Sequence, residues 1–157
     1  MDIKELKPTS IWHYFDAITG VPRPSKKEER IREFLLNFAK EQNLEVKVDK
    51  TGNVVITKEA TPGCEGAPTV ILQAHMDMVC EKNGDVKHDF ERDPIETYID
   101  GEWVKARGTT LGADNGIGMA AAMAVLADKE LKHGRIQALF TVDEETGLTG
   151  AFGLESG

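Results

Sequence analysis

A short apolar run, Thr69–Ala74, limits most strongly what this chain can fold into. The run is almost unbroken in apolar residues, and a polar and charged stretch follows at residues 81–93. Such runs are typical of strands that are buried on both faces, in sheets that helices cover. We therefore expect Thr69–Ala74 to be a strand buried on both faces, with a loop at residues 81–93.

Helical and strand patterns alternate around this run. Apolar residues recur at helical spacing in Thr9–Ile18, and Ser25–Glu28 has the sequence of a capping box that would open a helix ending near Asn43. The other patterns predict a helix at Ile117–Leu131 and strands at Leu44–Val48, Val54–Thr57, Thr97–Ile99, Trp103–Lys105 and Arg135–Val142. Helices that alternate with strands predict a layered α/β domain.

Composition excludes several classes of function. The 157 residues carry a net charge of −8, with the acidic residues spread along the chain, which argues against a nucleic-acid or anionic-membrane partner. We find no secretory signal and no apolar stretch long enough to span a bilayer. Two cysteines, Cys64 and Cys80, are too few for a disulfide scaffold, so a reducing cytoplasm is expected.

Side chains with metal-ligand chemistry follow two of the predicted strands. His75 and Asp77 project to the same face of an extended chain, which suits an imidazole ligand and the carboxylate that orients it. Asp143, Glu144 and Glu145 follow the last strand, and neighbouring side chains diverge, so one glutamate could bind metal while the other handles protons. Taken alone, the pair of His75 and Asp77 could also be a coincidence at the surface or at the edge of the core. The three consecutive acids could equally be a solvated turn.

A glycine-rich segment, Gly112–Gly118, directly precedes the predicted Ala-rich helix. Its glycines allow a sharp turn and close backbone approach, and Asp114 or Asn115 could equally be a simple helix cap. A phosphate-binding loop is a poor alternative, because no Gly-Lys-Ser/Thr follows and the loop carries an acid.

The three clusters together predict a metal site. Open α/β sheets place their sites beyond the carboxyl ends of strands, and two clusters lie at such ends while the third opens the helix between them. One imidazole and several carboxylates form a ligand set suited to zinc, manganese or cobalt.

The same residues resemble a known family. Leu72–Val79, Gly108–Gly118 and the Glu144-Glu145 pair are similar to motifs of the dinuclear zinc peptidases that include glutamate carboxypeptidases, aminoacylases and tripeptidases. The run from His88 to Thr110 most resembles the aminoacyl-histidine dipeptidase (Xaa-His dipeptidase, peptidase D) branch. The likeness extends from about Trp12 to the last residue.

The resemblance implies a role for each candidate residue. His75 would bind one of two zinc ions, with Asp77 steadying its imidazole, and Asp114 would bridge both ions. Glu145 would bind the second ion, and Glu144 would be the general base that passes a proton from the metal-held water to the leaving amine. The peptide bond after Asp114 is expected to be cis when metal is bound.

The family's length and fold are also implied. Members run to several hundred residues, with an inserted lid or dimerisation domain, so residues 1–157 would be the N-terminal part of the catalytic domain, without that lid and the C-terminal ligands. The expected fold is a truncated three-layer domain with a mixed β-sheet flanked by helices.

The expected function follows from the same resemblance. The complete protein would be a cytoplasmic homodimer that hydrolyses small dipeptides, preferentially Xaa-His, whereas the fragment alone would be inactive. Another dinuclear zinc peptidase or aminoacylase, and a non-catalytic metal-binding or assembly fragment, remain the alternatives.

Overall fold

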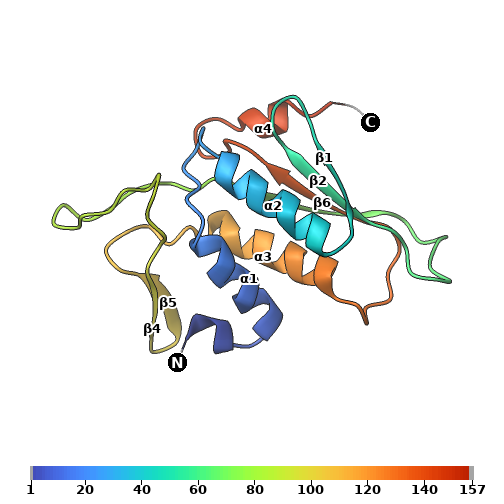
Figure 1. The fold of residues 1–157 in the computed structure, drawn as a ribbon, viewed down its shortest axis with the longest axis horizontal. Coiled ribbons are helices and arrows are strands. Elements are labelled where there is room, and N and C mark those ends of the chain that lie inside the picture. Colours follow the sequence, from blue (N-terminus) through green and yellow to red (C-terminus); the bar gives the residue numbers. More distant parts are fainter. Residues whose placement is uncertain (1, 156–157) are drawn as a thin grey trace.

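A computed structural model describes residues 2–155, and its elements follow the predicted alternation of helices and strands (Figure 1). In chain order they are the 3₁₀ helix η1 (Ile3–Glu5), α1 (Thr9–Thr19), α2 (Glu29–Glu41), β1 (Glu45–Val48), β2 (Val54–Lys58), β3 (Val70–His75), β4 (Thr97–Asp100), β5 (Trp103–Ala106), α3 (Ala113–Ala127), β6 (Ile136–Thr141) and α4 (Thr149–Phe152). None of the helices in this described part of the chain is long and apolar enough to cross a membrane.

Four strands form one mixed sheet, in the order β1-β2-β6-β3. β2 is antiparallel to both β1 and β6, whereas β6 runs parallel to β3 and pairs Thr141 with His75. Because parallel strands end at the same edge of a sheet, the residues that follow β3 and β6 emerge side by side. This pairing positions the candidate site. β4 and β5 form a separate two-stranded hairpin.

Helices cover one face of the sheet, with α2 over β1 and β2 and α3 over β6 and β3, while α1 packs against α3 (Figure 1). The buried residues of this layer are mostly aliphatic, aromatic and methionine side chains, among them Phe15, Ile31, Leu35, Ile56, Met119, Met123, Ala138 and Phe140. On the opposite face, residues of β3 and β6 line a cleft together with residues of α4. The predicted mixed α/β sheet flanked by helices is therefore confirmed.

The end of α3 lies four residues before the predicted one. The side chain of Asp128 accepts hydrogen bonds from the amides of Glu130 and Leu131, at 2.8 and 3.0 Å, and turns the chain out of the helix. The Lys58 ammonium donates to the carbonyl of Val125 at 3.1 Å and satisfies one of the free carbonyls at this helix end.

The prediction that β3 is buried on both faces is wrong. Val70 is 52% exposed and Ile71 is 61% exposed. Among residues 2–155, β3 pairs only with β6 and forms one edge of the sheet. An apolar run therefore lies at an unpaired edge, where its main-chain groups can pair with another strand.

The predicted capping box at Ser25–Glu28 is also wrong. α2 begins at Glu29, and no side chain bonds to its first amides. The Ser25 hydroxyl instead donates to Asp77 Oδ2 at 2.7 Å, and Glu28 Oε1 accepts from the Asp143 amide at 2.9 Å. Both side chains contact residues next to the candidate site, so their tertiary partners outweigh the local helix end.

We expect the isolated 157-residue chain to self-associate through β3. The opposite edge strand, β1, carries Glu45 and Lys47, and such charges discourage pairing between sheets, whereas the exposed start of β3 is uncharged. Ile71→Lys should lower the average mass measured by sedimentation velocity. Val48→Lys on β1, where the valine is 44% exposed, is the matched control and should change it little. A monomeric wild-type chain at every concentration would contradict this prediction.

Candidate metal centre

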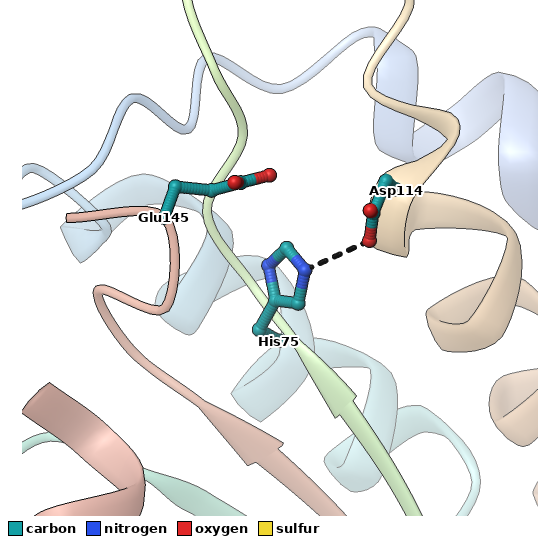
Figure 2. Close-up of side chains that lie close together, drawn as sticks. All are labelled: His75, Asp114 and Glu145. Carbon is teal, nitrogen blue, oxygen red and sulfur yellow. Dashed lines mark hydrogen bonds and ion pairs between the residues drawn. The ribbon is translucent and has the colours of Figure 1, made fainter. Parts of the chain in front are cut away.

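Three separate elements bring the candidate ligands together. His75 is the last residue of β3, Asp114 lies in the first turn of α3, and Glu145 follows β6. One ligand atom from each of these three side chains lies within 4.8 Å of the other two. Figure 2 shows the carboxylates of Asp114 and Glu145 directed into the space beside the imidazole of His75. The structure thus gathers the three residues that the sequence suggested as metal ligands.

The His75 imidazole is buried, and each of its nitrogens faces a different group. Nδ1 lies 3.0 Å from the carbonyl oxygen of Asp77 and 3.3 Å from its Oδ1. Nε2 lies 3.0 Å from Asp114 Oδ1 and 3.8 Å from Glu144 Oε2. Burial alone would lower the pKa of His75, but the carboxylates of Asp77 and Asp114 outweigh it and raise the pKa to about 9. The distances above show that Nε2, and not Nδ1, faces the other candidate ligands.

Asp77 is fully buried and holds several segments in place. Its Oδ1 accepts from the Glu144 amide at 3.0 Å, and its Oδ2 accepts from the Glu145 amide at 3.2 Å and from Ser25. Burial opposes the charge of this carboxylate, but the hydrogen bonds from His75, the Glu144 amide and Ser25 hold its pKa well below its ordinary value. Asp77 is thus an ionised group that ties the loop after β6 to the end of β3.

The glycine-rich loop presents Asp114 to His75. Gly112 has a left-handed backbone with φ of +72°, and the Asp114–Asn115 peptide bond is cis, as the family resemblance implied. A Cβ atom at Gly118 would lie 2.1 Å from Asn115 Oδ1, so any other residue there would displace the Asn115 side chain. The Asp114 side chain is 85% exposed and contacts His75. It therefore faces the site, and no side chain caps the start of α3.

Of the three consecutive acids after β6, Asp143 lies apart from the other two, whereas Glu144 and Glu145 do not diverge as expected. Asp143 is buried, and its carboxylate accepts hydrogen bonds from the hydroxyls of Thr146 and Thr149, at 2.5 Å each. Glu144 and Glu145 lie on the side of His75. Burial raises the pKa of Glu145, and the carboxylates of Asp114, Glu144 and Asp77 raise it further. A bound cation would relieve this crowding of negative charge.

Sequence reasoning missed that Glu28 joins Asp77 and Asp143 in a second group behind the candidate ligands. Carboxylate oxygens of Glu28, Asp77 and Asp143 also lie within 4.8 Å of one another, and all three residues are buried. Burial raises the pKa of Glu28, whose carboxylate accepts from the amides of Lys26 and Asp143. These contacts support the turn after β6 from the inside. No local pattern distinguishes Glu28 from a helix-capping residue.

A cleft of about 450 Å³ adjoins the candidate ligands. Its walls come from the open face of the sheet, from the start of α3 and from the chain after β6, and its lining residues are Gln73, His75, Asp114, Asn115, Leu139, Thr141, Glu144, Leu148, Ala151 and Leu154. The side chains of His75, Asp114 and Glu144 thus border this space.

The donor set fits a zinc-like divalent ion. Zinc accepts histidine nitrogen and carboxylate oxygen at about 2.0–2.2 Å, which separates neighbouring ligand atoms by roughly 3.3 Å around a tetrahedral ion. The 3.0 Å between His75 Nε2 and Asp114 Oδ1 is close to that separation. Glu145 offers a further carboxylate within reach, so these residues could hold one ion and contribute to a second.

Comparison with known proteins identifies the family. The sequence model of peptidase family M20/M25/M40 matches residues 71–156, which include every candidate ligand. The chain belongs to this family. It is 53% identical over 154 residues to the cytosol non-specific dipeptidase of Escherichia coli (strain K12), covering 98% of this chain and 32% of that protein.

Solved structures agree with this family membership. The aminoacylhistidine dipeptidase from Vibrio alginolyticus matches with a TM-score of 0.97 and 58% identity, covering 100% of this chain and 32% of that one. A tripeptidase from Staphylococcus aureus matches with a TM-score of 0.78 and 26% identity, covering 96% of this chain and 40% of that one. The chain thus spans about a third of the length of the two most similar of these three proteins.

We expect Asp77→Ala to destabilise this M20 chain strongly. The substitution removes a buried charge and leaves the amides of Glu144 and Glu145 and the Ser25 hydroxyl without their acceptor, at a cost of about 3–5 kcal/mol in the free energy of unfolding. Urea unfolding would measure the loss. Asp85→Ala, on an exposed loop, is the matched control and should change stability by less than about 0.5 kcal/mol. Equal stability of the two variants would rule out a structural role for Asp77.

Proposed function

We propose that this chain is the N-terminal part of the catalytic domain of a metal-dependent dipeptidase. The observation that carries the proposal is the grouping of His75, Asp114 and Glu145 within 4.8 Å of one another, beside a cleft that Glu144 also lines. The lid or dimerisation domain and the remaining ligands would come from chain beyond these 157 residues. The relatives' greater length supports this division.

The family resemblance suggests the ligand assignment, and the geometry of each side chain supports it. His75 binds one ion through Nε2, because its Nδ1 is already occupied by Asp77. Asp114 is exposed enough to offer both oxygens and would be shared by the two ions, and Glu145 would bind the second. Zinc is the expected metal, with manganese or cobalt as alternatives that the same ligands accept. The ions supply Lewis acidity, polarising the scissile carbonyl and lowering the pKa of water.

Glu144 is the proton carrier in this proposal. Its amide is fixed by Asp77, and its carboxylate lies at the wall of the cleft, 3.8 Å from His75. The carboxylate takes a proton from the attacking water as the new carbon–oxygen bond forms. It then gives this proton to the amine as the carbon–nitrogen bond breaks, which releases the two amino acids.

Dipeptides, preferentially those whose second residue is histidine, are the proposed substrates. Two relatives with more than 50% identity are named dipeptidases, one of them an aminoacylhistidine dipeptidase, whereas the tripeptidase is only 26% identical. The name of the E. coli relative also favours a cytoplasmic setting. We propose a homodimer for the complete protein. Another M20-type peptidase or aminoacylase, or a fragment that binds metal without turnover, are the competing functions.

Substitutions in the complete protein should separate proton transfer from metal binding. Glu144→Gln keeps the shape of the side chain but removes its basicity, so turnover should fall by about 10²–10⁴-fold with unchanged metal content. His75→Ala should lower the metal content itself. Glu102→Gln, on the exposed β4–β5 turn, is the control and should leave both unchanged. Near wild-type turnover in Glu144→Gln with full metal content would exclude Glu144 as the base.

The 157-residue chain alone should bind metal weakly and hydrolyse no dipeptide. Within residues 2–155 the assignment gives each ion two protein ligands, one of them shared, whereas such ions normally keep three or four. Metal analysis after dialysis and an Xaa-His hydrolysis assay would test this, with the complete reading frame as the positive control. Tripeptides and N-acyl amino acids in the same assay separate the competing activities. Two tightly held ions and full turnover in the short chain would contradict the prediction.

A further inference from the structure

One buried arginine contacts the chain segment directly after the candidate ligand His75 and the one before the candidate ligand Asp114. Arg23 lies between α1 and α2 and is only 1% exposed. Its Nη1 donates to the carbonyl of Met76 at 3.0 Å and to that of Asp77 at 3.1 Å. Its Nη2 donates to the carbonyl of Gly112 at 2.5 Å. The guanidinium thus bridges the exit of β3 and the loop that precedes Asp114.

The main chain around Arg23 strengthens this connection. The carbonyl of Arg23 accepts from the Met78 amide at 3.1 Å, and Pro24 forms a parallel bridge with Met78. Two residues later, Ser25 donates to the Asp77 carboxylate. The segment Arg23–Ser25 therefore runs alongside the exit of β3, and this alignment fixes where the guanidinium lies.

Two glycines of the loop leave space for this guanidinium. A Cβ atom at Gly112 would lie 2.5 Å from Arg23 Nη2, and one at Gly116 would lie 2.8 Å from the same atom. These glycines stand on either side of Asp114. The loop and the guanidinium are thus complementary in shape, which explains why glycines occupy these two positions.

The charge of Arg23 is costly to bury, so its contacts must compensate. Burial lowers its pKa to about 10, while the negative charge of Asp77 opposes the shift, so Arg23 is protonated at neutral pH. A planar guanidinium can donate to several carbonyls at fixed angles, which the compact ammonium of lysine cannot reproduce. Three carbonyls from two segments use this property.

We propose that Arg23 is a positioning residue that sets the spacing between His75 and Asp114, and with it the affinity and ligand geometry of the metal site. The proposal rests on the function proposed above, because it takes these two residues to be ligands. Arg23 touches neither ligand side chain and takes no part in the chemistry. Its effect passes through the backbone at Met76, Asp77 and Gly112.

Cobalt binding to the protein made from its complete reading frame would test this role. Arg23→Lys keeps the positive charge but loses the planar guanidinium that donates to three carbonyls. Gly116→Ala keeps the arginine but adds a methyl group that displaces its Nη2. Both should weaken cobalt binding, measured by competition with a chelator, by about 10–100-fold, as for other residues that orient metal ligands. The visible spectrum of bound cobalt should also change, since it reports ligand geometry. Arg30→Lys, on the exposed side of α2, is the matched control.

Two further measurements separate positioning from simple stabilisation. Hydrogen exchange should be faster at residues 110–118 in both variants, and cobalt affinity should fall at temperatures where thermal unfolding shows them folded. The proposal is overturned if Arg23→Lys folds and keeps the wild-type cobalt affinity and spectrum. If that variant does not fold, the same result in folded Gly116→Ala would overturn it. A wild-type protein that binds no cobalt, and is indistinguishable from His75→Ala, would instead remove the metal function on which it rests.

Discussion

The buried carboxylate of Asp77 is the interaction on which the site depends. Burying an ionised carboxylate is costly unless hydrogen bonds replace its water, and here the donors are Ser25 and the amides of Glu144 and Glu145, beside the imidazole of His75. These groups come from three distant parts of the chain. The charge is therefore stable only when the ends of β3 and β6 and the segment before α2 are assembled together.

Around the Asp77 carboxylate, some side chains are held by hydrogen bonds, whereas others are free to bind a ligand. The Arg23 guanidinium donates to three carbonyls, and the Asp77 carboxylate accepts from Ser25 and from the amides of Glu144 and Glu145. The carboxylates of Asp114 and Glu144 reach the cleft. Like charges at short distance repel one another, and a divalent cation bound between them would replace this repulsion by attraction. A metal site needs carboxylates that are free to bind the ion and a rigid structure that holds them in place.

The candidate ligands could be proposed from the sequence, whereas of their supports only Asp77 could. His75 and Glu145 stand at strand ends, where the rule for open α/β sheets places sites, and Asp114 stands between glycines. The other supports carry no such signal, because Ser25 and Glu28 match the spacing of a helix cap and only tertiary contacts show their partners. The exposed edge of β3 was missed for a related reason. Apolar composition predicts that a strand seeks cover, but the described residues supply a neighbour on one side only.

The candidate ligands and their supports also lie in different parts of the sequence relative to the family match. The family match begins at residue 71 and contains every candidate ligand, yet Arg23, Ser25 and Glu28 lie well before it. Those three side chains bond to the exit of β3, to the loop before α3 and to the turn after β6, which are the three places that carry ligands. The N-terminal segment thus supports all three places from outside the matched region, in addition to the β3–β6 pairing and Asp77 within it.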